Sequence, residues 1–163
     1  MPNSKSVIVI MGVSGSGKSK IGKLLSEKLA IPFFDGDDFH PKANVEKMAS
    51  GSPLNDDDRK EWLILLNKLA VKYRDKGAII ACSALKKNYR SILRAEMGNT
   101  MVFVYLDGSF ELIKSRLENR KGHFMPMDLL KSQFDTLEPP FKAITVSIEK
   151  TPEKIINEIV KQL

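Results

Sequence analysis

The sequence predicts a single α/β domain of three layers, in which a five-stranded, mostly parallel sheet is flanked by helices on both faces. The 163 residues correspond to about one domain of ordinary size. Short apolar runs alternate with longer amphipathic stretches, a pattern typical of a sheet wound on both sides. The first run, residues 7–11, is apolar throughout, as expected of a parallel strand that is buried on both faces.

The elements follow one another from this pattern. The predicted strands are residues 7–11, 31–34, 78–82, 101–106 and 143–148. The predicted helices are residues 18–29, 55–74, 87–97, 110–120, 128–137 and 152–163. The first helix places Ile21, Leu25 and Leu29 at helical spacing, and Pro152 suits the first turn of the last. Residues 121–126 break the pattern, so we expect a mobile lid at about residues 116–128 of one domain, 1–163.

Composition and charge exclude several classes of protein. The only cysteine, Cys82, rules out an intramolecular disulfide framework and fits a reducing, cytoplasmic location. The net charge of +6 favours anionic partners such as nucleotides or phosphorylated products. No apolar run approaches the roughly 18 residues that span a bilayer, so we expect no membrane partner. The aromatic content of 7% argues against the stacking surface of a nucleic-acid-binding ATPase, so we expect no nucleic acid partner.

A phosphate-binding loop follows the first predicted strand. Residues 12–19 fit the pattern G-x-x-x-x-G-K-[ST], between an apolar strand and an amphipathic helix. Backbone N–H groups of such a loop and the N-terminus of the next helix bind phosphate oxygens. Lys18 can reach the β- and γ-phosphates of ATP, and the Ser19 hydroxyl can bind Mg²⁺. The predicted nucleotide-binding residues here are Gly12, Val13, Ser14, Gly15, Ser16, Gly17, Lys18 and Ser19.

Two carboxylates follow the second predicted strand, at the sheet edge where ligands gather in such folds. Asp35 and Asp37 are separated by one residue and can divide the work between them. We expect Asp35 to hold Mg²⁺, directly or through water, and Asp37 to accept a hydrogen bond from an attacking hydroxyl. The alternative is an ordinary turn whose aspartates cap a helix.

Four further segments carry a family resemblance: residues 35–63, residues 82–90 (Cys-Ser-Ala-Leu-Lys-Lys-Asn-Tyr-Arg), residues 120–125 (Arg-Lys-Gly-His-Phe-Met) and residues 132–140. With the phosphate loop, they resemble the gluconokinase family of small P-loop kinases. One departure is Glu61, where the family often has proline before the tryptophan. The resemblance implies the P-loop kinase fold of adenylate and shikimate kinases and ATP-dependent phosphorylation of D-gluconate to 6-phospho-D-gluconate. It also implies a possible homodimer.

Basic residues are the candidates for contacts with the carboxylate of gluconate and with the transferred phosphoryl group. Arg59 and Arg90 are the candidates for the carboxylate, because a guanidinium can donate two parallel hydrogen bonds to it. The alternatives are an ion pair of Arg59 with neighbouring aspartates and a solvated basic helix face for Arg90. The other candidates for the substrate site are Asp37, His40, Lys47, Ser83 and Lys86.

Two arginines lie near the predicted lid. We expect Arg120 to neutralise charge on the moving phosphoryl group, and Arg116 to flank adenine together with Pro152. The alternative for both arginines is a basic helix C-terminus that complements the helix dipole.

Other activities remain alternatives at this stage. A regulatory GTPase is disfavoured because Asn67-Lys68 lacks the aspartate that would bind guanine. Among kinases, shikimate or a nucleoside monophosphate is the alternative acceptor.

Overall fold

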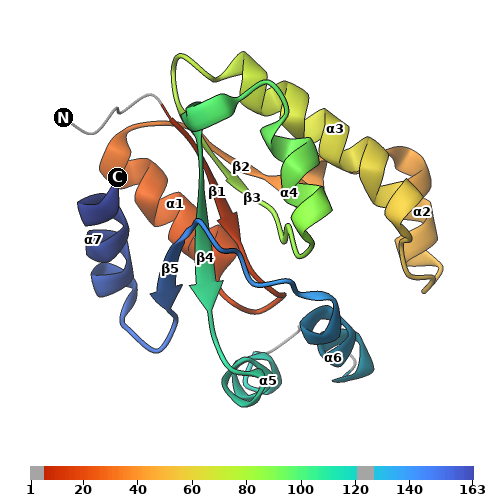
Figure 1. The fold of residues 1–163 in the computed structure, drawn as a ribbon. Helices are drawn as coiled ribbons and strands as arrows, with labels where there is room; N and C mark the ends of the chain where they lie inside the picture. Colours follow the sequence, from red (N-terminus) through yellow and green to blue (C-terminus); the bar gives the residue numbers. More distant parts are fainter. Residues whose placement is uncertain (1–5, 121–126) are drawn as a thin grey trace.

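The computed structural model describes residues 6–120 and 127–163 and has the three-layer architecture (Figure 1). The strands are β1 (Val7–Met11), β2 (Phe33–Asp35), β3 (Ala78–Ala81), β4 (Met101–Asp107) and β5 (Ile144–Ser147). They form one sheet in the order β2-β3-β1-β4-β5. Each neighbouring pair is parallel. The five-stranded sheet is therefore confirmed.

The predicted helices are all observed, with ends within two residues of the prediction except at one helix, and one further helix was not predicted. They are α1 (Lys18–Leu29), α2 (Lys42–Ala49), α3 (Asp56–Lys72), α4 (Lys87–Arg94), α5 (Phe110–Glu118), α6 (Met127–Thr136) and α7 (Pro152–Gln162). Two short 3₁₀ turns cover Gly36–Phe39 and Gly98–Thr100. The sequence pattern did not predict α2. The helix predicted over residues 87–97 ends at Arg94, because Ala95 has a non-helical ψ of 129° and Glu96 has a positive φ of 64°.

The central strand β1 separates two hydrophobic cores. Ile8 and Ile10 belong to the core that α1 and α7 cover. Val7, Val9 and Met11 belong to the core on the other face, where α3 and α4 pack. This alternation is the period of two that a strand imposes on its side chains. A strand that is apolar at every position is thereby buried on both faces.

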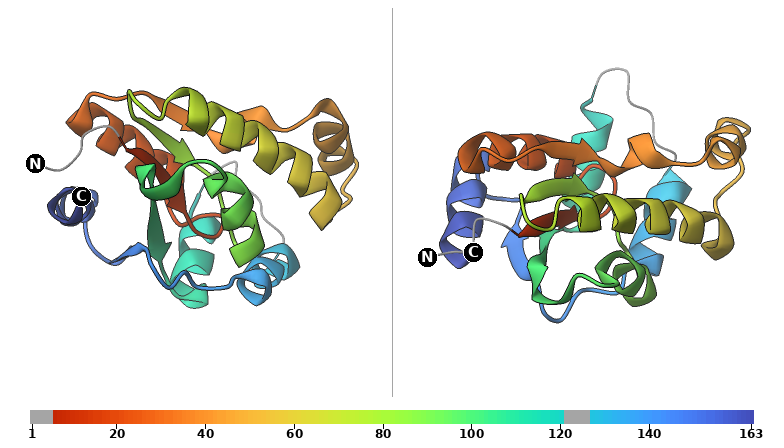
Figure 2. Two further views of the ribbon diagram at one scale, coloured as in Figure 1. Left: turned by 45° about the horizontal axis from the view of Figure 1, so that its top comes forward. Right: turned by 90° about the horizontal axis from the view of Figure 1, so that it is seen from above.

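The functional edge of the sheet lies at the carboxyl ends of the strands. The phosphate loop follows β1, Asp35 ends β2, and Ser83 comes two residues after β3. In Figure 1 the arrow of β4 points toward α5 on this side. Both views of Figure 2 show α2 and the start of α3 extending beyond the sheet. These two helices can therefore form a wall beside the phosphate loop.

The predicted lid is only partly covered by the structure. Residues 116–118 are the end of α5, and residues 127–128 begin α6. Residues 121–126 lie outside the described residues, so the lid stays a prediction. Within the described ranges, no helix has the length and apolar character needed to cross a membrane.

Candidate active site at the carboxyl edge of the sheet

The phosphate loop has the backbone conformation that its glycines permit. Gly17, directly before α1, has a φ of 98°, and Gly12 has a φ of 151°. A Cβ atom at Gly12 would lie 2.8 Å from Ser16 Oγ, whereas a Cβ atom at Gly17 would meet nothing within 4 Å. Gly17 therefore borders open space at the N-terminus of α1, where the helix dipole favours an anion.

Lys18 carries its charge inside this loop. Its Nζ donates hydrogen bonds to the carbonyl oxygens of Gly12 and Val13, at 3.0 and 3.1 Å. Burial lowers the pKa of Lys18, and the nearby Asp37 carboxylate partly offsets that effect. Among the ion pairs of the described residues, none involves Lys18. The ammonium is thus held by neutral carbonyls and is available to a phosphate.

Ser19 and Asp35 offer oxygen ligands at the start of α1. Ser19 Oγ donates to Asp35 Oδ2 at 3.2 Å, and the N–H of Asp37 donates to Asp35 Oδ1 at 3.0 Å. Within the described part of the chain no three His, Cys, Asp or Glu residues cluster as metal ligands. A hydroxyl beside one carboxylate fits Mg²⁺, which takes one or two protein oxygens and completes its shell with phosphates and water.

The Asp37 carboxylate is presented to solvent. Its side chain is 84% exposed, and Oδ1 lies 3.9 Å from Nε2 of His40. Partial desolvation near the loop and the adjacent Asp35 carboxylate raise the pKa of Asp37, while Lys18 lowers it. Solvent screens so exposed a group, which keeps these effects modest. Asp37 can therefore accept a hydrogen bond from a hydroxyl that approaches the phosphate loop.

Next to Asp37, the side chains of His40, Trp62 and Asn44 are held by ring stacking and hydrogen bonds. The His40 ring stacks on Trp62, with centroids 4.2 Å apart, and Trp62 Nε1 donates to the carbonyl of Gly36 at 2.8 Å. Asn44 is 4% exposed. Its Nδ2 lies 3.3 Å from His40 Nδ1 and donates to the carbonyl of Asp58 at 2.9 Å. Burial lowers the pKa of His40, so its neutral form is favoured.

The aspartates at the start of α3 form ion pairs as well as complementing its dipole. Lys47 Nζ lies 2.6 Å from Asp58 Oδ2, and Lys86 Nζ lies 3.2 Å from Asp56 Oδ1. Asp58 also completes a capping box with Asn55. These pairs bring Lys47 and Lys86, two predicted substrate residues, to the same end of α3.

The hydroxyl of Tyr89 joins Arg59 to this network. It donates to Asp56 and accepts a hydrogen bond from Arg59 Nη1 at 3.3 Å. The structure therefore brings Arg59 together with Lys86 across the faces of α3 and α4. Among the described residues, Asp58 and Asp56 form their ion pairs with Lys47 and Lys86 and not with Arg59.

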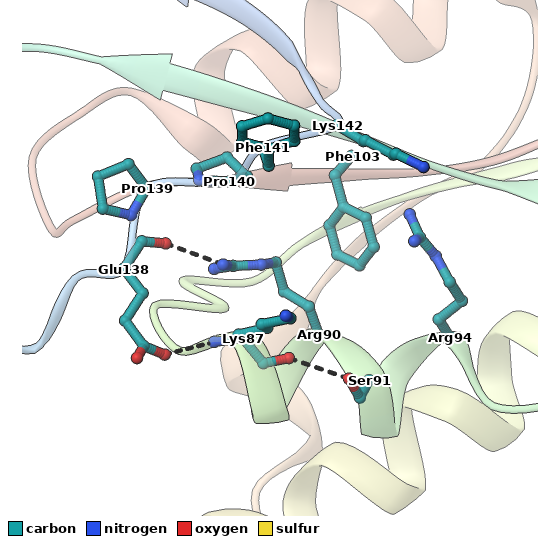
Figure 3. A pocket seen from close by; sticks show the side chains of 10 residues that line it. All are labelled: Lys87, Arg90, Ser91, Arg94, Phe103, Glu138, Pro139, Pro140, Phe141 and Lys142. Carbon is teal, nitrogen blue, oxygen red and sulfur yellow. Dashed lines mark hydrogen bonds between the residues drawn. The ribbon is translucent and has the colours of Figure 1, made fainter.

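Arg90 is oriented differently from Arg59. Its guanidinium donates to the carbonyl oxygens of Ala84, Leu85 and Glu138, at 2.8, 3.3 and 2.8 Å. It also lines a surface cavity of about 430 Å³, beside Phe103 and Arg94 (Figure 3). Arg90 is the only predicted site residue in this lining. These hydrogen bonds indicate that Arg90 holds the β3–α4 loop in place.

The remaining predicted residues fall beside the loop or beside α7. The carbonyl of Ser83 accepts a hydrogen bond from the N–H of Gly12 at 3.3 Å. Arg116 Nη2 donates to the carbonyl of Ile148 at 2.6 Å, and Pro152 begins α7 nearby. Arg116 therefore contacts the β5–α7 connection, at whose end Pro152 lies, and the position of adenine stays a prediction. Arg120 is exposed at the end of the first described range.

Sequence reasoning missed one residue that touches the phosphate loop. Gln133 of α6 forms two hydrogen bonds with Ser14, although 119 positions separate them. Gln133 lies in the segment 132–140, which carries part of the family resemblance. No spacing rule predicts this long-range contact. Asn44 and Tyr89 were missed for the same reason.

A parallel sheet with a phosphate loop between β1 and α1, and with a Ser–Asp pair beside it, defines a P-loop kinase. The shikimate kinase family model matches residues 14–163. Thermoresistant gluconokinase of Escherichia coli is 45% identical over 161 residues, which cover 95% of this chain and 91% of that protein. Gluconokinase of Gluconobacter oxydans is 44% identical over 160 residues, covering 94% and 89%. The chain belongs to the gluconokinase family.

Solved structures agree with this assignment. A gluconokinase from Sinorhizobium meliloti superposes with a TM-score of 0.89 at 39% identity, covering 96% of this chain and 90% of that one. A shikimate kinase from Aquifex aeolicus gives a TM-score of 0.65 at 24% identity, covering 94% of each chain. The second likeness supports the fold alone.

Proposed function

We propose that this protein transfers the γ-phosphoryl group of ATP to the terminal hydroxyl of D-gluconate, which forms 6-phospho-D-gluconate. The observation that carries the proposal is the exposed carboxylate of Asp37, set between the phosphate loop and the wall of α2 and α3. An acceptor bound to that wall would present a hydroxyl to both. The gluconokinases that align over most of the chain support gluconate as the acceptor.

Each residue of the phosphate side has a proposed role. The backbone of residues 12–19 cradles the phosphates, and Ser19 and Asp35 hold Mg²⁺. When bound, Mg²⁺ neutralises negative charge on the phosphate oxygens. Lys18 and Arg120 stabilise the charge that develops on the moving group. Asp37 accepts a hydrogen bond from the attacking hydroxyl and mainly orients it, because a loose transition state needs little help from early proton removal.

We propose Arg59, rather than Arg90, as the residue that binds the gluconate carboxylate. A guanidinium has five N–H donors in a fixed fork. The described hydrogen bonds use one donor group of Arg59, toward Tyr89, whereas Arg90 donates to three carbonyls. Arg59 therefore keeps the donors that a bidentate contact needs. His40, Lys47, Ser83 and Lys86 are proposed to bind the hydroxyls of the sugar acid.

Three further expectations stay predictions. Adenine is proposed to lie between Arg116 and Pro152, beside the β5–α7 connection. The free, buried thiol of Cys82 suits a reducing compartment, which supports a cytoplasmic location. A homodimer is proposed from the family resemblance alone.

The test of the function is a coupled assay for ADP formation over a panel of acceptors. We expect turnover with D-gluconate that exceeds turnover with shikimate and with adenosine monophosphate by orders of magnitude. Mass spectrometry of the product should show one added phosphoryl group, on the terminal hydroxyl. Preferential turnover of shikimate or of a nucleoside monophosphate would replace gluconate as the acceptor.

Replacing Arg59 with lysine should weaken gluconate binding selectively. Arg59→Lys keeps the charge but removes the planar fork. We expect the KM for gluconate to rise by about tenfold, because one charge-assisted hydrogen bond to the carboxylate is lost. The KM for ATP should stay unchanged. Steady-state kinetics with each substrate varied in turn gives both constants.

Arg74→Lys is the matched control for this experiment. Arg74 lies beyond the other end of α3, where its Nη1 donates to the carbonyl of Glu96. This variant should leave both Michaelis constants unchanged. A parallel rise of both constants in Arg59→Lys would place Arg59 outside the carboxylate site. A selective effect of Arg90→Lys on gluconate would transfer the role to Arg90.

A further inference from the structure

The α6 helix holds the apex of the phosphate loop through one side chain. The N–H of Ser14 donates to Gln133 Oε1 at 2.7 Å, and Gln133 Nε2 donates to Ser14 Oγ at 3.0 Å. Both ends of the amide are used by the same residue, so the amide cannot rotate without losing both hydrogen bonds. This double contact fixes the orientation of Ser14 relative to α6.

The next residue of the loop packs against α5. A Cβ atom at Gly15 would lie 2.9 Å from Cγ of Leu117 and 3.1 Å from Cγ2 of Ile113. Phe110 of α5 and Phe134 of α6 meet edge to face, with centroids 5.5 Å apart. The apex of the loop is therefore seated between two helices that are packed against each other.

The contact with Gln133 also determines the direction in which the Ser14 hydroxyl can donate its hydrogen. A serine hydroxyl has one hydrogen to donate and two lone pairs. Because Ser14 Oγ accepts from Gln133 Nε2, its hydrogen must point away from Gln133 and remains available to another acceptor. The main-chain N–H of Ser14 is already used by Gln133 Oε1, so the hydroxyl is the donor that Ser14 can offer to a phosphate oxygen.

We propose that Gln133 is a positioning residue for nucleotide binding, which acts through Ser14. It holds the apex of the loop in the form that receives the triphosphate, and it orients the Ser14 hydroxyl as a donor. Gln133 itself need not contact ATP. This inference rests on the proposed function only in that the loop binds ATP, and it does not depend on the identity of the acceptor.

The main test is direct ATP binding by isothermal titration calorimetry, with Mg²⁺ present and gluconate absent. Gln133→Ala should bind ATP about tenfold more weakly, because two neutral hydrogen bonds of ordinary strength are lost. With ATP saturating, the KM for gluconate should not change. Gln162→Ala on α7 is the matched control. Among the described residues, the Gln162 side chain donates within its own helix, to the carbonyl of Glu158 at 3.4 Å, so this variant should bind ATP like the parent protein.

Two more variants separate positioning from a merely structural role. Gln133→Glu keeps the acceptor oxygen but loses the donor and brings a negative charge toward the triphosphate, so it should weaken ATP binding more than Gln133→Ala does. The double variant Ser14→Ala with Gln133→Ala should bind ATP within about twofold of Gln133→Ala, because residues that act as one unit are not additive.

Two outcomes would overturn the inference: unchanged ATP affinity in Gln133→Ala, whether or not its unfolding temperature is lowered, or additive losses in the double variant. The test also separates this inference from the proposed function. If the parent protein binds ATP but does not phosphorylate gluconate, the proposed acceptor fails while the role of Gln133 can still be measured.

Discussion

Lys18→Ala is expected to remove most phosphoryl transfer while the protein stays folded. The Lys18 ammonium is the cation inside the phosphate loop, and the described residues give it no carboxylate partner that would neutralise it. In the alanine variant, the charge that develops on the transferred group loses this fixed partner. We expect kcat to fall by about 10²–10³-fold, the usual cost of removing one preorganised electrostatic contact.

The fold should tolerate this substitution. Burial lowers the pKa of Lys18, which means that the charged form is desolvated in its folded position. Removing the side chain relieves that cost and loses only two hydrogen bonds to carbonyls of the same loop. We therefore expect an unfolding temperature close to that of the parent protein.

The measurements are kcat with both substrates saturating, and gluconate affinity by calorimetry. Gluconate affinity should change little, because the proposed acceptor site lies on the wall of α2 and α3 and not on the phosphate loop. Lys20→Ala is the control, since Lys20 is an exposed lysine in the first turn of α1. Near-normal turnover in Lys18→Ala would remove the phosphate loop from the mechanism.

The fold could be predicted where burial alone decides the pattern. The residues of β1 are apolar at every position because both of its faces are covered, and the predicted bounds of this strand are those observed. The α2 helix shows the limit of such reasoning. Its one fully buried residue is Asn44, a polar side chain whose partners lie in other segments. Such a helix lacks the regular spacing of apolar residues from which a helix is predicted.

The candidate site also has a part that could be predicted from the sequence and a part that could not. Motifs contiguous in sequence, such as the phosphate loop and the pair Asp35 and Asp37, could be found because neighbouring residues make the site. The orientation of Arg90 could not be predicted, because one of its three carbonyl acceptors, Glu138, lies 48 positions away in the sequence. The capping alternative for the acidic cluster also has support, since Asp35 accepts from the N–H of Asp37. One carboxylate can cap this turn and still face Ser19.

Asp37→Asn should lower turnover with gluconate by about 10²–10⁴-fold, the range for a positioned base. A loose transition state would put the loss near the lower end. The amide keeps the size of the side chain but accepts a hydroxyl hydrogen bond less strongly than a carboxylate does. Because the Asp37 side chain is exposed and makes no hydrogen bond among the described contacts, the fold should be unaffected.

The pH profile adds a second readout for this variant. Partial desolvation and, to a smaller extent, the neighbouring Asp35 carboxylate raise the pKa of Asp37 above the ordinary value for aspartate. The protonated carboxyl cannot serve as acceptor, so kcat/KM should fall as the pH drops through this raised pKa. That acid limb should be lost in Asp37→Asn. An unchanged acid limb would assign it to another group.

Asp35→Asn separates the metal side from the acceptor side. Asp35 contacts Ser19 Oγ, whereas Asp37 lies nearer His40. Asp35→Asn should therefore raise the Mg²⁺ concentration needed for half-maximal activity, and excess Mg²⁺ should partly restore turnover. The same excess should not restore Asp37→Asn, because its defect lies in orienting the hydroxyl. A magnesium titration of both variants decides the roles: rescue of Asp37→Asn alone would exchange them, and full activity in both would exclude this acidic cluster from the reaction.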